Sequence, residues 1–185
     1  ILSDDLGWAD LSCYGSTFHE SPNLDKLAAQ GMRFTQAYSS SPLCSPSRAA
    51  LMTGRSPARL KITDIFPRQP ESGKLLPAEM KTELPLEEVT IAEVLRDAGY
   101  TTLRAGKWPV GPAPGQRPWE RGFQRTYGSM HGVVSPWHHL GHANALGDFW
   151  QRDGQPLTEE GVHTTDLLTT QTITWLREQA VPPAP

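Results

Sequence analysis

The chain has 185 residues, of which 37% are hydrophobic and 20% charged, and its formal net charge is −3. This length suits one domain with a hydrophobic core. The slightly acidic balance argues against a nucleic-acid-binding protein, which usually presents a basic face. No apolar stretch approaches the roughly 20 residues of a membrane-spanning helix, so we expect no membrane span. The two cysteines, Cys13 and Cys44, could form one disulfide, but their spacing does not require it.

Two adjacent carboxylates stand near the start of the chain. Residues 1–3 are predicted to be the end of an apolar strand, and Asp4 and Asp5 follow it directly. In open α/β sheets, ligands bind beyond the C-terminal ends of strands. Because Ca²⁺ and Mg²⁺ prefer carboxylate oxygens, the pair could help to bind such an ion. A solvated acidic turn is the alternative, and a calcium site would need further ligands.

The first half of the chain contains two predicted helices. Ser21, as N-cap, and Gly31, just beyond the C-terminus, bound the first one. Residues 32–35 then alternate in polarity like a strand. The second helix is expected to start near Ser45 and to end by Gly54, and a loop rich in proline and charge follows it.

The second half begins with a capping box. Thr90 and Glu93 are spaced to cap a helix that ends at Gly99, and its apolar residues are expected to face the core. Residues 100–105 indicate the next strand. A loop-rich stretch at 109–163 precedes a last helix at 164–179. Strands that alternate with helices predict an α/β sheet flanked by helices.

Three side chains could carry out chemistry on an anion. Cys44 stands at the start of the second helix, where backbone N–H groups favour negative charge. Arg48 adds a planar fork of donors that fits a tetrahedral oxyanion. Lys107, after the strand at 100–105, could neutralise charge on a substrate. The alternatives are a small buried cysteine and an ordinary surface lysine.

Four histidines form a loose cluster between residues 130 and 142. Their spacing matches no strict pattern of metal ligands. A loop that merely contains histidines is therefore favoured over a transition-metal site. The cluster consists of His131, His138, His139 and His142.

Taken together, these residues resemble the sulfatase family. The segment from Cys44 to Arg55 matches the family signature Cys-x-Pro-Ser-Arg-x-x-Leu-x-Thr-Gly-Arg. The resemblance implies an alkaline-phosphatase-like α/β sheet flanked by helices. It also implies that residues 1–185 are the N-terminal part of a single sulfatase catalytic domain, truncated at both ends. Further matches follow in the same order: Asp4–Trp8, Ser21–Asp25, Gly106–Trp108, Arg121–Phe123 and Thr164–Glu178.

The resemblance implies a sulfuric ester hydrolase. In this family, a formylglycine-generating enzyme reads the motif from Cys44 to Arg48 and oxidises the cysteine to Cα-formylglycine. The hydrated aldehyde then attacks the sulfur of a sulfate monoester. Asp4, Asp5 and the modified Cys44 would bind Ca²⁺, while Arg48 would orient the nucleophile and Lys107 would contact the sulfate oxygens. The substrate would be a small-molecule or carbohydrate sulfate ester, and the parent protein is expected to be exported.

Two departures from the family pattern limit this expectation. Pro109 replaces the usual histidine of Gly-Lys-Trp-His-Leu-Gly, and general acid–base help of that kind is worth ~10²–10⁴-fold. A nearby histidine could substitute for it. Asp4, Asp5 and residue 44 alone leave the calcium site incomplete, so we predict that this chain is inactive by itself. The alternatives are a formylglycine-dependent phosphonate monoester or phosphodiester hydrolase, and a non-catalytic relic that binds sulfated ligands.

Overall fold

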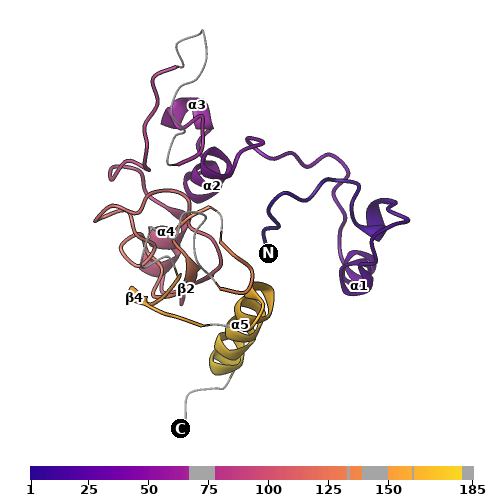
Figure 1. The fold of residues 1–185 in the computed structure, drawn as a ribbon. Helices are drawn as coiled ribbons and strands as arrows, with labels where there is room; N and C mark the ends of the chain where they lie inside the picture. Colours follow the sequence, from indigo (N-terminus) through magenta and orange to yellow (C-terminus); the bar gives the residue numbers. More distant parts are fainter. Residues whose placement is uncertain (67–77, 133, 139–149, 160, 181–185) are drawn as a thin grey trace. The chain divides into compact units, whose positions relative to one another are not determined.

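The computed structural model describes five stretches of the chain. The chain is divided into two compact units, Ile1–Ser39 and Ser40–Pro185 (Figure 1). The first unit contains a 3-10 turn, η1 (Ser12–Tyr14), and one helix, α1 (Pro22–Gln30). The described stretches are residues 1–66, 78–132, 134–138, 150–159 and 161–180.

The carboxylate of Asp25 joins η1 to α1 within the first unit. Its Oδ1 accepts hydrogen bonds from the backbone N–H of Cys13 and from the hydroxyl of Ser21, both at 2.9 Å. The Ser21 hydroxyl accepts from the backbone N–H of Ser12 at 2.9 Å, so its side chain does not cap α1 as the sequence predicted. The helix itself is confirmed. Its last residue is followed by Gly31 at φ −126°, which is not the left-handed conformation expected there.

The two strands expected in the first unit are absent. Residues 1–3 and 32–35 have no strand conformation in the described structure. A strand is stabilised by hydrogen bonds to a neighbouring strand, and no strand lies in this unit. A local pattern of apolar residues was therefore not sufficient.

In its described residues, the second unit contains four helices and a four-stranded sheet of order β1-β2-β3-β4. β1 pairs with β2 in parallel, and the other neighbours pair antiparallel. The helices are α2 (Cys44–Thr53), α3 (Pro57–Leu60), α4 (Ile91–Asp97) and α5 (Thr164–Ala180). The strands are β1 (Leu103–Ala105), β2 (Arg125–Ser129), β3 (Trp150–Arg152) and β4 (Gln155–Pro156).

Local capping explains why two of these helices, α2 and α4, were predicted well. Gly54 ends α2 with φ +69°, and its N–H donates to Ala50. At α4, Thr90 Oγ1 accepts from the N–H of Glu93 at 3.2 Å, and the Glu93 carboxylate accepts from the N–H of Thr90 at 2.7 Å. The expected capping box is thus confirmed, as is the helix at the end of the described chain. No helix in the described ranges is long and apolar enough to cross a bilayer.

The expected inward face of α4 is wrong. Ile91 and Val94 are 50% and 56% exposed, and the buried residue of this helix is Ala92. The helix is held instead by polar contacts, because the buried Thr90 hydroxyl also donates to the carbonyl of Arg121 at 2.9 Å. The apolar side of α4 therefore faces solvent.

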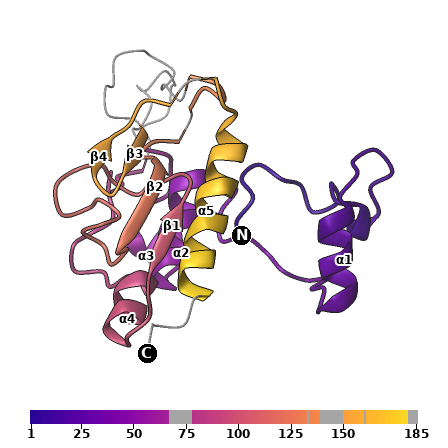
Figure 2. The same ribbon diagram turned by 90° about the horizontal axis from the view of Figure 1, so that it is seen from below.

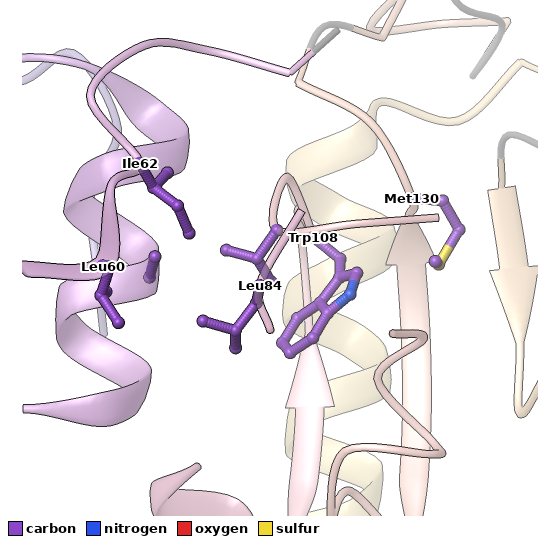
Figure 3. Close-up of a cluster of buried hydrophobic side chains, with 7 residues drawn as sticks. Leu60, Ile62, Leu84, Trp108 and Met130 are labelled. Carbon is purple, nitrogen blue, oxygen red and sulfur yellow. The ribbon is translucent and has the colours of Figure 1, made fainter. Parts of the chain in front are cut away.

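Two clusters of buried side chains form the core of the second unit. Tyr127 of β2 and Met130, which follows the end of β2, belong to different clusters. Tyr127 packs with Trp150 and with Trp175, which brings α5 against β1 and β2 (Figure 2). The second cluster (Figure 3) joins α2 and α3 to the end of β2 and consists of Ala49, Leu60, Ile62, Leu84, Trp108, Val110 and Met130.

Candidate functional site

Cys44 is the first residue of α2. Leu43 before it is extended, at φ −111° and ψ 152°, and accepts a backbone hydrogen bond from Ser47 at 3.1 Å. Ser45, which follows Cys44, is fully buried, and its hydroxyl accepts a hydrogen bond from the N–H of Phe66 at 3.0 Å. The first turn of α2, next to Cys44, is therefore fixed to the segment that contains Phe66. Backbone N–H groups in this first turn favour an anion.

Lys107 reaches Cys44 from the end of β1. Its Nζ lies 3.1 Å from the Sγ of Cys44, and its backbone carbonyl accepts from Nη1 of Arg48 at 3.0 Å. The structure thus brings together three of the residues predicted for the site, Cys44, Arg48 and Lys107. Two elements that are distant in sequence, α2 and the segment after β1, meet at this point.

Close packing of two glycines fixes the backbone around Lys107. A Cβ on Gly128 would lie 2.4 Å from the carbonyl oxygen of Gly106, a distance that no side chain could tolerate. The N–H of Gly106 donates to Tyr127 and that of Trp108 donates to Ser129, both at 2.9 Å. The segment that carries Lys107 therefore continues the pairing of β1 with β2.

Arg104 is a residue of this region that the sequence did not single out. It is 9% exposed, and its Nη2 donates to the carbonyl of Ser129 at 2.6 Å and to that of Gly106. Its guanidinium also lies 5.7 Å from the ring centroid of Trp108. Burial, together with the like charge of Arg48, lowers the pKa of Arg104 to about 9. Its position in the middle of the strand predicted at residues 100–105 was the available signal.

The described histidines do not form a metal site. His131 follows β2, and its backbone N–H donates to the hydroxyl of Ser129 at 3.0 Å. Burial lowers the pKa of His131, so its imidazole is neutral at neutral pH. His138 is exposed, whereas His139 and His142 lie outside the described residues. Among the residues that the structure describes, no group of three or more His, Cys, Asp or Glu could hold a metal ion.

The expected calcium ligands lie in the first unit. Asp4 and Asp5 are exposed, and Asp5 has φ +56°, which aspartate adopts more readily than most residues. Their oxygens suit Ca²⁺, but two carboxylates are fewer ligands than the ion takes. The site that would join them to residue 44 stays a prediction. Cys13 and Cys44 are both free cysteines in this structure.

Pro109 occupies a buried turn after Trp108. The Trp108 indole N–H donates to the carbonyl of Gln116 at 2.9 Å, and the carbonyl of Val110 accepts from the N–H of Leu84 at 3.0 Å. The turn is thus held on both sides by structural hydrogen bonds. Proline has no group that could transfer a proton at this position.

Comparisons with known proteins agree on one family. The family model described as Sulfatase matches residues 1–183. Rat N-acetylgalactosamine-6-sulfatase is 42% identical over 139 residues, which cover 74% of this chain and 26% of that protein. Human arylsulfatase A is 50% identical over 130 residues, which cover 69% of this chain and 24% of that protein. The chain therefore spans about a quarter of the length of these relatives.

Solved structures agree with the sequence comparison. The crystal structure of Ps i-CgsB has a TM-score of 0.80 and 29% identity, covering 97% of this chain and 40% of that one. Its complex with k-i-k-neocarrahexaose matches with a TM-score of 0.80 and 28% identity, covering 98% of this chain and 41% of that one. PsFucS1 sulfatase from Pseudoalteromonas sp. matches with a TM-score of 0.65 and 28% identity, covering 96% and 39%. The expected fold, an alkaline-phosphatase-like α/β sheet flanked by helices, is confirmed.

Proposed function

Because the chain belongs to the sulfatase family, we propose that the protein carrying it hydrolyses a sulfate ester and that residue 44 provides the nucleophile. One observation carries this proposal: the ammonium group of Lys107 lies 3.1 Å from the Sγ of Cys44 at the start of α2. A cation, the N–H groups of the first turn of α2 and a potential nucleophile thus lie close together. This arrangement suits attack on a group that carries negative charge.

The Sγ of Cys44 marks the position from which the reactive oxygen of Cα-formylglycine would project. The modified residue would supply an aldehyde hydrate, a nucleophile that a thiol cannot provide. Lys107 would place its ammonium group on the sulfate oxygens and neutralise the charge that develops there. Arg48 would orient residue 44 and, through its hydrogen bond to the Lys107 carbonyl, hold that lysine in place.

We further propose that Asp4 and Asp5 contribute two ligands to a calcium ion, which would supply positive charge beside the sulfate. Two carboxylates and residue 44 do not complete the ligand set of this ion. The chain of 185 residues is therefore expected to hydrolyse no aryl sulfate by itself, even when Ca²⁺ is added. Turnover of 4-nitrophenyl sulfate by the isolated chain would contradict this expectation.

A sulfated carbohydrate is the substrate class that we propose. The relatives include N-acetylgalactosamine-6-sulfatase, and the structure of the related Ps i-CgsB has been solved in complex with k-i-k-neocarrahexaose. A small aryl sulfate is the simpler alternative, in line with the name of arylsulfatase A.

The test uses the full-length protein, produced together with a formylglycine-generating enzyme. Mass spectrometry of the peptide that carries residue 44 reports the oxidation, and hydrolysis of 4-nitrophenyl sulfate reports the activity. The Cys44→Ala variant, which cannot be modified, is the control and is expected to be inactive. Preferential hydrolysis of an aryl phosphonate would assign the protein to the related phosphonate monoester and phosphodiester hydrolases.

A non-catalytic protein that binds sulfated ligands is the second candidate, and Pro109 is the observation that favours it. The usual histidine is absent at this buried turn, so proton transfer would have to come from elsewhere. An unmodified Cys44 in the native protein, combined with binding of a sulfated sugar but no hydrolysis, would support this candidate.

A further inference from the structure

Both backbone peptide units around the Cα of Lys107 are held by arginine side chains. The carbonyl of Lys107, in the unit that follows this Cα, accepts a hydrogen bond from Nη1 of Arg48 at 3.0 Å. The carbonyl of Gly106, in the unit that precedes it, accepts a hydrogen bond from Nη2 of Arg104. Because each peptide unit is planar, only φ and ψ of Lys107 lie between the two units. The two arginines together therefore restrict both angles and the direction in which the lysine side chain leaves the backbone.

The same nitrogen of Arg104 joins this segment to β2. Nη2 also donates to the carbonyl of Ser129 at 2.6 Å, and that carbonyl accepts from the N–H of Trp108 at 2.9 Å. A carbonyl oxygen has two lone pairs, so Ser129 can accept both hydrogen bonds. The residues before and after Lys107 are thus both held at the end of one strand. From this backbone, Nζ of Lys107 lies 3.1 Å from the Sγ of Cys44.

A charged side chain is costly at the position of Arg104. The residue is buried, and no carboxylate among the described residues forms an ion pair with it. Its Nε is also buried and has no hydrogen-bond partner in the described part of the chain. A buried charge without a counter-ion lowers stability. Exceptions of this kind to the rules of folding are expected at functional sites, and the segment that carries Lys107 is the functional element that Arg104 contacts.

We propose that Arg104 is a positioning residue for the reaction: by holding the peptide unit before Lys107, it directs the side chain of that lysine towards residue 44. Its hydrogen bonds go to backbone carbonyls, and its guanidinium lies 5.7 Å from the ring centroid of Trp108. Its effect on catalysis therefore passes through Lys107. This role rests on the proposed function, which assigns Lys107 to the sulfate oxygens.

A double-mutant cycle separates positioning from a general effect on the fold. The active full-length protein is compared with Arg104→Met, Lys107→Met and the variant that carries both substitutions, with 4-nitrophenyl sulfate as substrate. The matched control is Arg121→Met. Arg121 is 2% exposed and also donates to backbone carbonyls, those of Pro85 and Glu88, but within the described structure it makes no hydrogen bond to residues 106–108.

We expect Arg104→Met to lower kcat about 10–100-fold and to leave KM nearly unchanged, as is usual when support for a catalytic group is lost. In the Lys107→Met background the same substitution should change kcat by less than about twofold, because no lysine remains to be positioned. Arg104→Lys keeps the charge without the planar fork and should recover part of the loss. Arg121→Met should lower stability and keep the kcat of the folded protein, with the folded fraction measured by circular dichroism.

Hydrogen exchange of backbone amides gives a readout that needs no catalysis. The N–H groups of Gly106 and Trp108 donate to β2, and the N–H of Asp153 donates to the same strand at Thr126. In the full-length protein with an unmodified residue 44, Arg104→Met should accelerate exchange at positions 106 and 108 about tenfold more than at position 153. This is the effect of losing a charge-assisted hydrogen bond to the segment.

An equal loss of kcat in the presence and absence of Lys107 would overturn the role of Arg104, and so would an unchanged kcat or unchanged exchange at positions 106 and 108. If Arg104→Met does not fold, Arg104→Lys replaces it in every comparison. Failure of the proposed function has a different signature. In that case the unmutated protein hydrolyses no sulfate ester, while exchange at positions 106 and 108 still depends on Arg104.

Discussion

Lys107 is held by its backbone as well as by its side chain. Its carbonyl accepts a hydrogen bond from Arg48. The carbonyls of Gly106, which precedes it, and of Ser129 on the neighbouring strand β2 accept hydrogen bonds from Arg104. The backbone that carries the lysine is therefore fixed, and its side chain contacts residue 44 from there. A cation positioned in advance needs no rearrangement when charge develops in the transition state.

Replacing Lys107 by methionine should keep the length of the side chain and remove its charge. In the active full-length protein we expect Lys107→Met to lower kcat/KM for 4-nitrophenyl sulfate by roughly 10²–10³-fold, as for the loss of one donor to a developing oxyanion. The matched control is Lys81→Met, because Lys81 is exposed and pairs with Glu87. An unchanged kcat/KM in Lys107→Met would remove the lysine from the mechanism.

Tyr127 should make the stability depend on alkaline pH. Burial, aided by the hydrogen bond to Glu159, raises the pKa of the Tyr127 phenol to about 12, compared with about 10 in an unfolded chain. The stabilisation is complete below pH 10 and is lost as the pH rises through about 12. Between these values the contribution of Tyr127 to the free energy of unfolding should fall by about 1.4 kcal/mol per pH unit.

Urea unfolding of the wild type and of Tyr127→Phe across this range measures the effect. The variant should lack the fall, because it has no phenol to ionise, whereas exposed Tyr100→Phe should retain it. Arg104 acts in the opposite direction, since its pKa of about 9 lies below its unfolded value and stability rises as the folded form loses its proton. The difference between wild type and variant isolates Tyr127. Parallel pH profiles for the two proteins would contradict the assignment.

At the scale of elements, the approach of β1 to β2 depends on two glycines with similar backbone conformations. Gly106 has φ +125° and Gly128 has φ +121°. A Cβ on Gly128 would clash with the carbonyl oxygen of Gly106, whereas nothing lies within 4 Å of a Cβ on Gly106. The pair therefore separates the energetic effect of a strained φ from that of a steric clash.

Alanine at each glycine tests this difference. Gly106→Ala should lower the free energy of unfolding by about 1–2 kcal/mol, the cost of a left-handed conformation for a residue with a side chain. Gly128→Ala should cost about 1–3 kcal/mol more, because the added methyl group must displace the Gly106 carbonyl. Denaturant titration of both variants gives the two values. Equal losses would mean that the close approach relaxes without cost.

Helices α2 and α4 could be predicted because their ends are encoded locally, whereas α3 (Pro57–Leu60) lies where a loop was expected. Thr90 with Glu93 and the left-handed Gly54 act over three or four residues. The strands β2 to β4 could not, because each is only two to five residues long. In addition, β2 and β3 pair across 21 to 25 positions of sequence, as Tyr127 does with Arg152.

The same distinction applies to the candidate site. Cys44 and Arg48 share one helix, so their sequence pattern already placed them together. The contact of Lys107 with Cys44 spans 63 positions and depends on how the end of β1 packs near α2. Arg104 was missed because its hydrogen-bond acceptors are backbone carbonyls, which have no sequence signature.

At the scale of the whole molecule, many large apolar side chains remain exposed. On α4 they form a continuous stripe of Ile91, Val94 and Leu95, which are 50%, 56% and 36% exposed. Ile173 and Leu176 of α5 are 41% and 59% exposed. Exposed apolar surface of this kind favours association between molecules.

We expect the chain of 185 residues to self-associate and to bind a hydrophobic dye when it is studied alone. Val94→Lys should reduce both effects, because it places a charge in the middle of the α4 stripe. Thr158→Lys adds the same charge at an exposed polar position and should have little effect. Sedimentation velocity and dye fluorescence measure the change, and a monomer that binds no dye would contradict the expectation.

The buried guanidinium of Arg104 also bears on inhibition. Its charge repels that of Arg48, which is one cause of its lowered pKa. An oxyanion held beside Arg48 offsets this repulsion, so anion binding and protonation of Arg104 support each other by linkage. That gain does not require an alcohol to be attached to the sulfate, because it comes from the anionic charge. Under the proposed function, inorganic sulfate released by the reaction would thus compete with the next substrate, as would phosphate.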